Sequence, residues 1–325
     1  MEGLLNILVT SAGRRTSLIA AFQNAAHPFG QKVLVADFDP LAPACALADG
    51  AFMVPRVSDP GYLPALRAIA REQEVGLIVP TIDPELAALS RQVETFRRDG
   101  VSVLVSAPEF VAVCRDKWMT SRFFKAEGID VPASWLPDTA MAALPEEIFL
   151  KPRDGSASSN ICRCRREDLQ RVLPSVPNAL IQECLYGVEI TIDSFLDFQS
   201  RPIHYVPRER IRTLGGESIQ GVTLDRPELD PWLVQVLQAC SRLGARGPLT
   251  LQAFLTERGP VLTEVNPRFG GGFPLGLAAG GDYPAWILAL LRGETLEPRL
   301  GQYRRGLYMS RYYREIFTET LPWPR

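Results

Sequence analysis

Three polar side chains alternate at the end of an apolar run late in the chain: Glu264, Asn266 and Arg268, followed by glycines at 270–272. Alternate residues of a strand share one face, so these side chains would project to the same side. Carboxylate and amide oxygens suit a hard cation such as Mg2+, which usually completes its octahedron with water and nucleotide phosphates, and arginine binds phosphate or carboxylate bidentately. These residues alone leave two interpretations open: a metal and phosphate wall, or an ordinary strand end with an exposed ion pair.

A second predicted strand, residues 249–255, precedes this run and carries Gln252. The sequence Glu-Arg-Gly-Pro at 257–260 predicts a hairpin turn between the two strands. Because facing residues of a hairpin lie on adjacent strands, Gln252 is expected to lie opposite Glu264.

A lysine lies near the end of another predicted strand, residues 148–152. Lys151 is followed by a loop of small residues that contains Ser156 and Ser158. A polyphosphate requires such a point charge, together with backbone N–H groups that can approach its oxygens. The alternative is a solvated hairpin with an exposed lysine, and the local sequence leaves both open.

Two further predicted strands, residues 180–185 and 188–193, are separated by Gly187, with Glu183 before it and Glu189 after it. An acid therefore stands on each side of one glycine turn.

Cations precede another pair of glycines in the segment 208–216, which includes Arg208 and Arg210. This segment is either a flexible loop over an anionic ligand or a charged hairpin.

The composition is that of an ordinary globular protein, with 325 residues, 46% hydrophobic and 22% charged. A net charge of -2 gives no overall basic field, so nucleic acid and anionic membrane are poor partners. The chain has neither a signal-peptide pattern nor an apolar segment of ~20 residues, which predicts a cytoplasmic protein without a membrane span.

Histidine and cysteine chemistry is disfavoured. Only His27 and His204 are present, and neither has a Cys or Asp constellation near it in the sequence. The pair Cys162 and Cys164 lacks the second pair that a zinc site would need.

Strands and helices alternate through the first third of the chain, which predicts a parallel sheet with covering helices. The predicted strands are residues 4–10, 32–37, 76–80 and 101–105, and the predicted helices are residues 16–26, 62–73 and 84–99. No Gly-x-Gly-x-x-Gly follows the first strand, so a dinucleotide site is weakly supported. Ligands of such sheets lie at the carboxyl ends of the strands, where this chain has Arg14, Arg15 and Asp37.

The regular alternation of predicted strands and helices changes after residue 107, which predicts a domain boundary. We expect three units, residues 1–113, 114–185 and 186–325. Near the end, residues 304–317 alternate roughly as a strand, and we expect its tyrosines at 308, 312 and 313 to pack.

The order and spacing of these residues resemble the ATP-grasp superfamily. The set that carries the resemblance is Lys117, Lys151 with its small-residue loop, Gln182, Glu183, Glu189, Gln252 and the run Glu264-Val265-Asn266-Pro267-Arg268. The sequence is similar to the ATP-binding modules of the carbamoyl-phosphate synthase large subunit and to related stand-alone carboxylate–amine ligases. The resemblance implies an α/β fold, in which a Rossmann-like parallel-sheet domain precedes a two-subdomain ATP-grasp module with an α+β lid.

The resemblance also implies a role for each residue of the set. Lys117 and Lys151, with Ser156 and Ser158 of the loop, would hold the ATP phosphates, while Gln182, Glu183 and Leu185 would line the adenine and Glu189 would bind the ribose. Gln252, Glu264 and Asn266 would coordinate one or two Mg2+ ions, which Mn2+ could replace, and Arg268 would stabilise charge on the transferred phosphoryl group. The loop departs from the family pattern, because it has Ala157 and serines where glycines are usual.

By this resemblance the chain is an ADP-forming ligase that activates a carboxylate as an acylphosphate for attack by an amine. Arg210 and Arg268 would clamp the carboxylate, and the acceptor side is matched only loosely, by Arg208 and the turn with Thr81, Asp83 and Glu85. The alternatives are phosphorylation of bicarbonate or carbamate, a non-catalytic nucleotide-binding protein, and a nicotinamide-linked oxidoreductase. The expected partners are small-molecule carboxylate and amine substrates, and the expected assembly is a homodimer.

Overall fold

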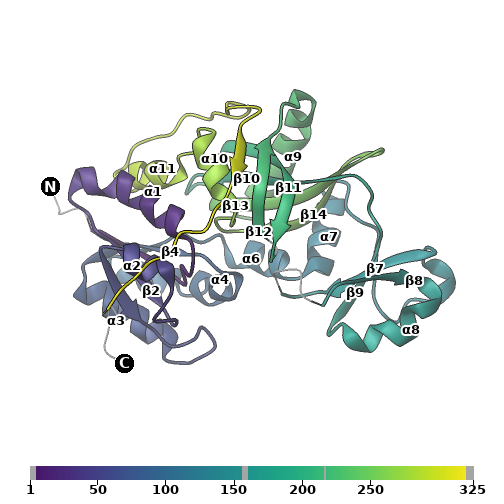
Figure 1. Ribbon diagram of the computed structural model, residues 1–325, viewed down its shortest axis with the longest axis horizontal. Coiled ribbons are helices and arrows are strands. Elements are labelled where there is room, and N and C mark those ends of the chain that lie inside the picture. Colours follow the sequence, from purple (N-terminus) through teal and green to yellow (C-terminus); the bar gives the residue numbers. More distant parts are fainter. Residues whose placement is uncertain (1–4, 156–159, 216, 320–325) are drawn as a thin grey trace.

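The computed structural model describes residues 5–155, 160–215 and 217–319. Three β-sheets, each formed by a continuous part of the chain, make up the described fold (Figure 1). The first is parallel and the other two are antiparallel, which confirms the predicted parallel-sheet domain followed by an ATP-grasp-like module.

The first sheet has the strand order β3-β2-β1-β4-β5, with every neighbouring pair parallel. Its strands are β1 (Asn6–Thr10), β2 (Val33–Asp37), β3 (Gly50–Met53), β4 (Val75–Pro80) and β5 (Ser102–Val103). The helices of this part are α1 (Thr16–Ala26), α2 (Pro43–Leu47), α3 (Tyr62–Glu72), α4 (Asp83–Ser90), α5 (Val93–Arg98) and α6 (Pro108–Arg115), with the 3-10 helix η1 (His27–Phe29). Along β1, Ile7 and Val9 pack into the core under α1, whereas Leu8 packs into the core under α3. Both faces of the sheet are therefore covered, and apolar residues form nearly the whole strand.

The second sheet is small and has its own core. Its order is β6-β9-β7-β8, and its core contains Ile148, Leu150 and Ile181. The elements here are α7 (Lys117–Ala126), β6 (Ser134–Trp135), η2 (Met141–Ala143), β7 (Glu147–Pro152), β8 (Cys162–Arg165), η3 (Arg166–Asp168), α8 (Leu169–Val172), η4 (Leu173–Ser175) and β9 (Ala179–Glu183). Asp116 caps α7 by accepting hydrogen bonds from the backbone N–H groups of Trp118 and Met119.

The third sheet has the order β14-β13-β10-β11-β12-β15. Its elements are β10 (Val188–Leu196), β11 (Pro202–Leu214), β12 (Glu217–Thr223), η5 (Pro227–Leu229), α9 (Asp230–Arg242), β13 (Gly247–Thr256), β14 (Gly259–Asn266), α10 (Phe273–Ala278), α11 (Tyr283–Leu291) and β15 (Tyr308–Ser310). Residues 208–214 belong to β11 and pair with β12, so this part of the segment 208–216 fits the charged-hairpin interpretation; Gly216 lies outside the described residues.

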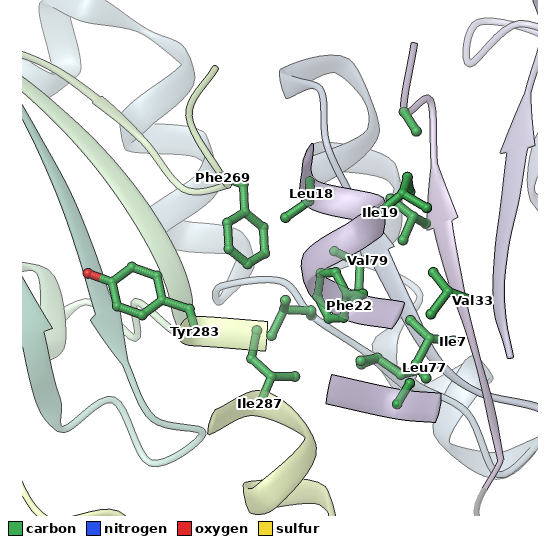
Figure 2. Close-up of a cluster of buried hydrophobic side chains, with 14 of the residues drawn as sticks. Ile7, Leu18, Ile19, Phe22, Val33, Leu77, Val79, Phe269, Tyr283 and Ile287 are labelled. Atoms are coloured by element: carbon green, nitrogen blue, oxygen red, sulfur yellow. The ribbon is translucent and has the colours of Figure 1, made fainter. Parts of the chain in front are cut away.

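The first and last parts of the chain share one hydrophobic core. Figure 2 shows Phe22 of α1 beside Phe269, with Ile287 of α11 facing the same cluster. The ring centroids of Phe22 and Phe269 lie 5.9 Å apart in an edge-to-face arrangement, and those of Phe269 and Phe273 lie 4.8 Å apart. The first sheet and the segment after β14 are therefore held as one packed unit.

Two local predictions are wrong. Residues 84–99 form two helices, α4 and α5, because the chain leaves helical geometry between Ser90 and Val93. The segment 304–317 contains only the short strand β15, at the edge of the third sheet, and Tyr308, Tyr312 and Tyr313 are 73%, 84% and 79% exposed. No described element covers that segment, so its alternating pattern does not correspond to a buried face.

None of the helices in the described ranges is long and apolar enough to span a membrane.

Candidate active site

A cavity of about 650 Å3 is lined by residues of the second and third sheets and by residues that follow β1 and β4 of the first sheet. This volume lies within the usual range for small-molecule sites. Of the thirteen residues that the sequence predicts for the site, eleven line it: Lys117, Lys151, Gln182, Glu183, Leu185, Glu189, Arg210, Gln252, Glu264, Asn266 and Arg268. The other two, Ser156 and Ser158, lie outside the described residues.

The carboxylate and the two amides lie together on β13 and β14. Gln252 is the cross-strand partner of Glu264, and Thr250 is the partner of Asn266. The predicted juxtaposition of Gln252 and Glu264 is therefore confirmed. Glu264 and Asn266 both line the cavity because residues two apart in a strand share a face.

The donor set fits Mg2+ bound together with a nucleotide. Gln252, Glu264 and Asn266 are three oxygen-bearing side chains with only one negative charge, so phosphate oxygens and water would have to complete an octahedron. In residues 5–155, 160–215 and 217–319, no group of three His, Cys, Asp or Glu side chains is arranged to hold a metal ion. These residues therefore suit a metal that arrives with phosphate better than a permanently held ion.

Two lysines approach the cavity from the second sheet and from α7. Lys151 lies near the end of β7 and is only 9% exposed. Its pKa is lowered to about 8, mainly by burial and in smaller part by nearby Lys117, while the carboxylate of Glu264 partly opposes this shift. The Lys117 ammonium donates a hydrogen bond to the carbonyl oxygen of Gly155 at 2.7 Å. Two partly desolvated cations thus lie where the phosphates are expected.

The segment between the second and third sheets borders the same cavity. Gln182 is buried and donates a side-chain hydrogen bond to the hydroxyl of Ser134 at 2.8 Å. The Glu183 carboxylate accepts from the backbone N–H of Ala133 at 2.9 Å and from Arg258 at 2.5 and 3.0 Å. These contacts fix the strand end and lower the pKa of Glu183. The side chain of Glu183 is thus already engaged, so its main chain is better placed for contacts with a base.

Each of the two predicted arginines has a carboxylate partner. Arg268 donates to both oxygens of Asp83, at 2.8 and 2.7 Å, and Asp83 begins α4 of the first domain. Arg210 pairs with Glu189 on the neighbouring strand β10. Both arginines line the cavity with their orientation already set, so a ligand would meet preorganised donors.

In the turn after β4, one polar residue faces the cavity and two are buried. Asp83 lines the cavity, whereas Thr81 and Glu85 are fully buried. The Glu85 carboxyl accepts hydrogen bonds from the Ser11 hydroxyl at 2.6 Å, the backbone N–H of Thr81 at 3.1 Å and the hydroxyl of Tyr62. Burial raises the pKa of Glu85. Asp83 is therefore the residue of this turn that a ligand in the cavity could contact, while Glu85 supports the turn after β1.

The sequence reasoning did not single out two acids of the site. Glu217 of β12 lines the cavity and pairs with Arg14 at 3.3 Å and with Arg311 at 3.3 Å. Asp193 does not line the cavity itself but forms a buried ion pair at 2.8 Å with Arg208, which does. Asp193 ends an alternating apolar segment, which is a detectable signal, whereas nothing local distinguishes Glu217.

Comparison with family models gives two adjoining matches. Residues 7–104 match a PylC-like N-terminal domain, and residues 114–272 match an ATP-grasp domain. None of the curated proteins matches the sequence.

Solved structures of several ligases and carboxylases share the fold. The biotin carboxylase domain of Hydrogenobacter thermophilus 2-oxoglutarate carboxylase, in complex with MgADP and bicarbonate, has a TM-score of 0.75 at 16% identity, covering 94% of this chain and 73% of its own. N5-carboxyaminoimidazole synthetase from Staphylococcus aureus, with ADP, has a TM-score of 0.73 at 14% identity, covering 92% and 80%. L-amino acid ligase from Bacillus licheniformis has a TM-score of 0.69 at 17% identity, covering 89% and 74%.

At these identities the structural neighbours show the fold alone. The two sequence matches together extend from the first strand to the glycines that follow Arg268. The chain therefore combines a PylC-like N-terminal domain with an ATP-grasp domain.

Proposed function

We propose that this protein is an ADP-forming ligase that joins a carboxylate to an amine. A carboxylate oxygen attacks the γ-phosphorus of ATP, and ADP leaves. The amine nitrogen then attacks the acyl carbon of the acylphosphate, inorganic phosphate leaves, and the nitrogen loses a proton to give the amide. The observation that carries this proposal is that two lysines, three oxygen donors and two oriented arginines line one cavity.

Residues of the second sheet and β10 would hold the nucleotide. Lys117 and Lys151 would present ammonium groups to the phosphates, the residues from Gln182 to Leu185 would border the base, and Glu189 would bind the ribose. The support for these roles is that Lys117, Lys151 and Glu189 all line the cavity. Phosphoryl transfer depends mainly on positioning and on neutralisation of charge, so no protein nucleophile is required.

Gln252, Glu264 and Asn266 would hold one or two Mg2+ ions, or Mn2+ in their place. The ions would supply neutralisation of the negative charge on the phosphates. Glu264 also opposes the lowering of the Lys151 pKa, so a single carboxylate serves both the metal and the lysine.

Arg268 and Arg210 would orient the carboxylate. Asp83 holds the guanidinium of Arg268 in plane through two hydrogen bonds. The carbonyl of Phe269 and the side-chain oxygen of Asn266 accept two more, at 3.2 and 3.3 Å, which leaves one of the five N–H groups without an acceptor among the described residues. Glu189 pairs with Arg210, so ribose binding and carboxylate binding would be linked through this pair.

Bicarbonate is the second candidate acceptor. The Hydrogenobacter thermophilus domain was solved with bicarbonate and as a dimer, and it shares the fold over most of this chain. A bicarbonate-dependent release of ADP without an amine would favour this reaction. We also propose a homodimer, which light scattering of the purified protein tests directly.

Nucleotide binding is the first test. Saturating Mg·ATP should raise the unfolding temperature of the wild-type protein, because a ligand at ~100 times its Kd stabilises the folded state by about 2.7 kcal/mol. Lys151→Met and Glu264→Gln should lose most of this stabilisation, while the exposed control Lys125→Met should keep it.

Release of ADP across pairs of carboxylates and amines then tests the reaction, with bicarbonate as one arm. Binding of Mg·ATP without ADP release for any pair would favour a non-catalytic nucleotide-binding protein. Wild-type protein that gains no stability from Mg·ATP would refute the proposed function.

A further inference from the structure

Arg15 faces the cavity from the first domain without a carboxylate partner in the described parts of the chain. Its guanidinium donates to two main-chain carbonyls, of Thr81 at 3.0 Å and of Phe269 at 3.3 Å. The cavity arginines Arg208 and Arg268 each have a carboxylate partner. The pKa of Arg15 is lowered to about 10, mainly by burial and also by Arg268, while the carboxylates of Glu217, Asp83 and Glu85 partly oppose this shift. The charge of Arg15 is thus destabilised in the absence of a bound anion.

The local structure around Arg15 is unfavourable by itself. Arg15 is the N-cap residue of α1, where its positive charge opposes the helix dipole. The first turn of α1 contains no acid that would offset this charge. Ser11, four residues earlier, has a left-handed φ of 48°, which is strained for a residue with a Cβ. The Ser11 hydroxyl donates to Glu85 at 2.6 Å, and the N–H of Gly13 donates to Asp37 at 2.9 Å. Such strain, held in place by buried acids, is typical of a functional position.

Arg208 supplies to the same region a hydrogen-bond donor that has no acceptor among the described residues. It is 2% exposed and donates from Nε to Asp193 at 2.8 Å, whereas its Nη1 has no hydrogen-bond partner among the described residues. A Cβ on Gly272 would overlap this guanidinium, so a glycine is needed for the turn to lie over it. An unsatisfied buried donor is costly, and an acceptor from a ligand would relieve that cost.

One turn connects the two arginines. Arg15 binds the carbonyl of Phe269 at its start, and Arg208 lies under Gly272 at its end. This turn follows Glu264, Asn266 and Arg268, so it lies beyond the residues assigned to metal and phosphate. The lining of the cavity includes both Arg15 and Arg208.

We propose that Arg15 and Arg208 bind an anionic group of the acceptor that is distinct from the carboxylate activated beside Arg268. The substrate class is therefore a compound with two acidic groups, in which the retained group is a carboxylate or a phosphate. Arg15 is the specificity-determining residue of this subsite, and the buried Arg208 is its second anion-binding residue. The inference rests on the proposed function, because the activated carboxylate is assigned by it.

Binding of di-acids by calorimetry tests this subsite. The protein is first saturated with Mg·AMP-PNP, so that added anions do not occupy the phosphate positions. Succinate and phosphonoacetate serve as di-acid probes, and monomethyl succinate is the matched mono-acid. At least one di-acid should bind at ~10 mM or below and the mono-acid at least about tenfold more weakly, because a charge-assisted hydrogen bond is lost. Preference for succinate or for phosphonoacetate distinguishes a carboxylate from a phosphate.

Variants of Arg15 separate direct contact from general effects. Arg15→Gln should weaken the di-acid at least about tenfold and leave the mono-acid unchanged. Arg15→Lys should restore part of the affinity, because it keeps the charge but loses the planar fork. Arg97→Gln, an exposed residue of α5 paired with Glu94, is the control and should change nothing. Arg208 itself is left intact, because removal of one partner from a buried ion pair can unfold the protein.

Three results would overturn the subsite: no binding of either di-acid, equal binding of di-acid and mono-acid, or equal di-acid affinity in wild type and Arg15→Gln. Each can occur while Mg·AMP-PNP still binds, and the proposed function then stands without this subsite. Failure of Mg·AMP-PNP to bind refutes the proposed function instead. The di-acid affinities of nucleotide-free wild type and Arg15→Gln are then compared, because anions at the lysines would contribute equally to both and only a difference between them supports the subsite.

Discussion

Lys151 is a buried cation whose charge costs stability until phosphate is bound. It is 9% exposed, and its pKa is lowered to about 8 from the usual 10.5. Methionine has a similar length and volume but no charge, so Lys151→Met removes the buried charge while the packing around β7 is largely kept. We expect the nucleotide-free variant to be more stable than wild type and unable to bind ATP, which is a trade of function for stability.

The size of the expected stability gain follows from the pKa shift of Lys151. Between pH 8 and 10.5 the unfolded chain binds more protons at Lys151 than the folded chain does, so the free energy of unfolding of wild type rises with pH across this window. Below pH 8 the whole cost of the charged form applies. At 1.36 kcal/mol for each pKa unit this cost is roughly 3 kcal/mol, an upper value for the gain from Lys151→Met at neutral pH.

Denaturant unfolding of nucleotide-free wild type and Lys151→Met, from neutral pH to about pH 10, measures this gain. The two free energies of unfolding should differ most at neutral pH and converge as the pH rises through 8. Lys125→Met, an exposed change on α7, should follow wild type at every pH. A Lys151→Met protein that is less stable than wild type, or that keeps the same pH slope, would refute the reasoning.

Two further substitutions test the geometry of the site. Asp83→Asn leaves Arg268 without its charged bidentate partner, so kcat/KM for the carboxylate should fall about 10- to 100-fold while the Kd for Mg·ATP stays constant; an equal loss in both would contradict this separation. Gly187→Ala should lower stability by more than about 2 kcal/mol, because φ is +151° and the new Cβ would overlap the carbonyl oxygen of Leu255. Gly259→Ala, with a φ of +109° and open space around it, is the control in the same thermal unfolding assay and should cost only about 1 kcal/mol.

Features set by short-range patterns could be predicted from the sequence. The helix expected over residues 16–26 is α1, with the same bounds, because its apolar positions recur with the helical period. The pairing of Gln252 with Glu264 was also predictable, since a short hairpin fixes the register of its strands. In both cases the information lies within about twenty residues of the chain.

Features set by packing between distant segments could not be predicted. Arg268 and Asp83 are 185 residues apart, and their ion pair exists only because the first domain packs against the turn after β14. The exposure of Tyr312 is of the same kind, since an alternating pattern does not show whether another element covers the strand. Arg15 was distinguishable locally, because a cation at a helix N-terminus conflicts with the helix dipole. Its lack of a carboxylate partner among the described residues, however, depends on the whole cavity.

The two ends of the cavity rest on different packing. Phe22 and Phe269 belong to one core shared by the first domain and the segment after β14, so the acceptor end is held rigidly. Lys151 lies on β7, whose core includes Leu150 and draws only on the second sheet and its neighbours. That sheet is joined to the third by partly exposed pairs such as Glu183 with Arg258, each worth about 0–1 kcal/mol. The residues proposed for the acceptor therefore lie beside the core shared by the first and last parts of the chain, whereas Lys151 lies on a sheet with a separate core.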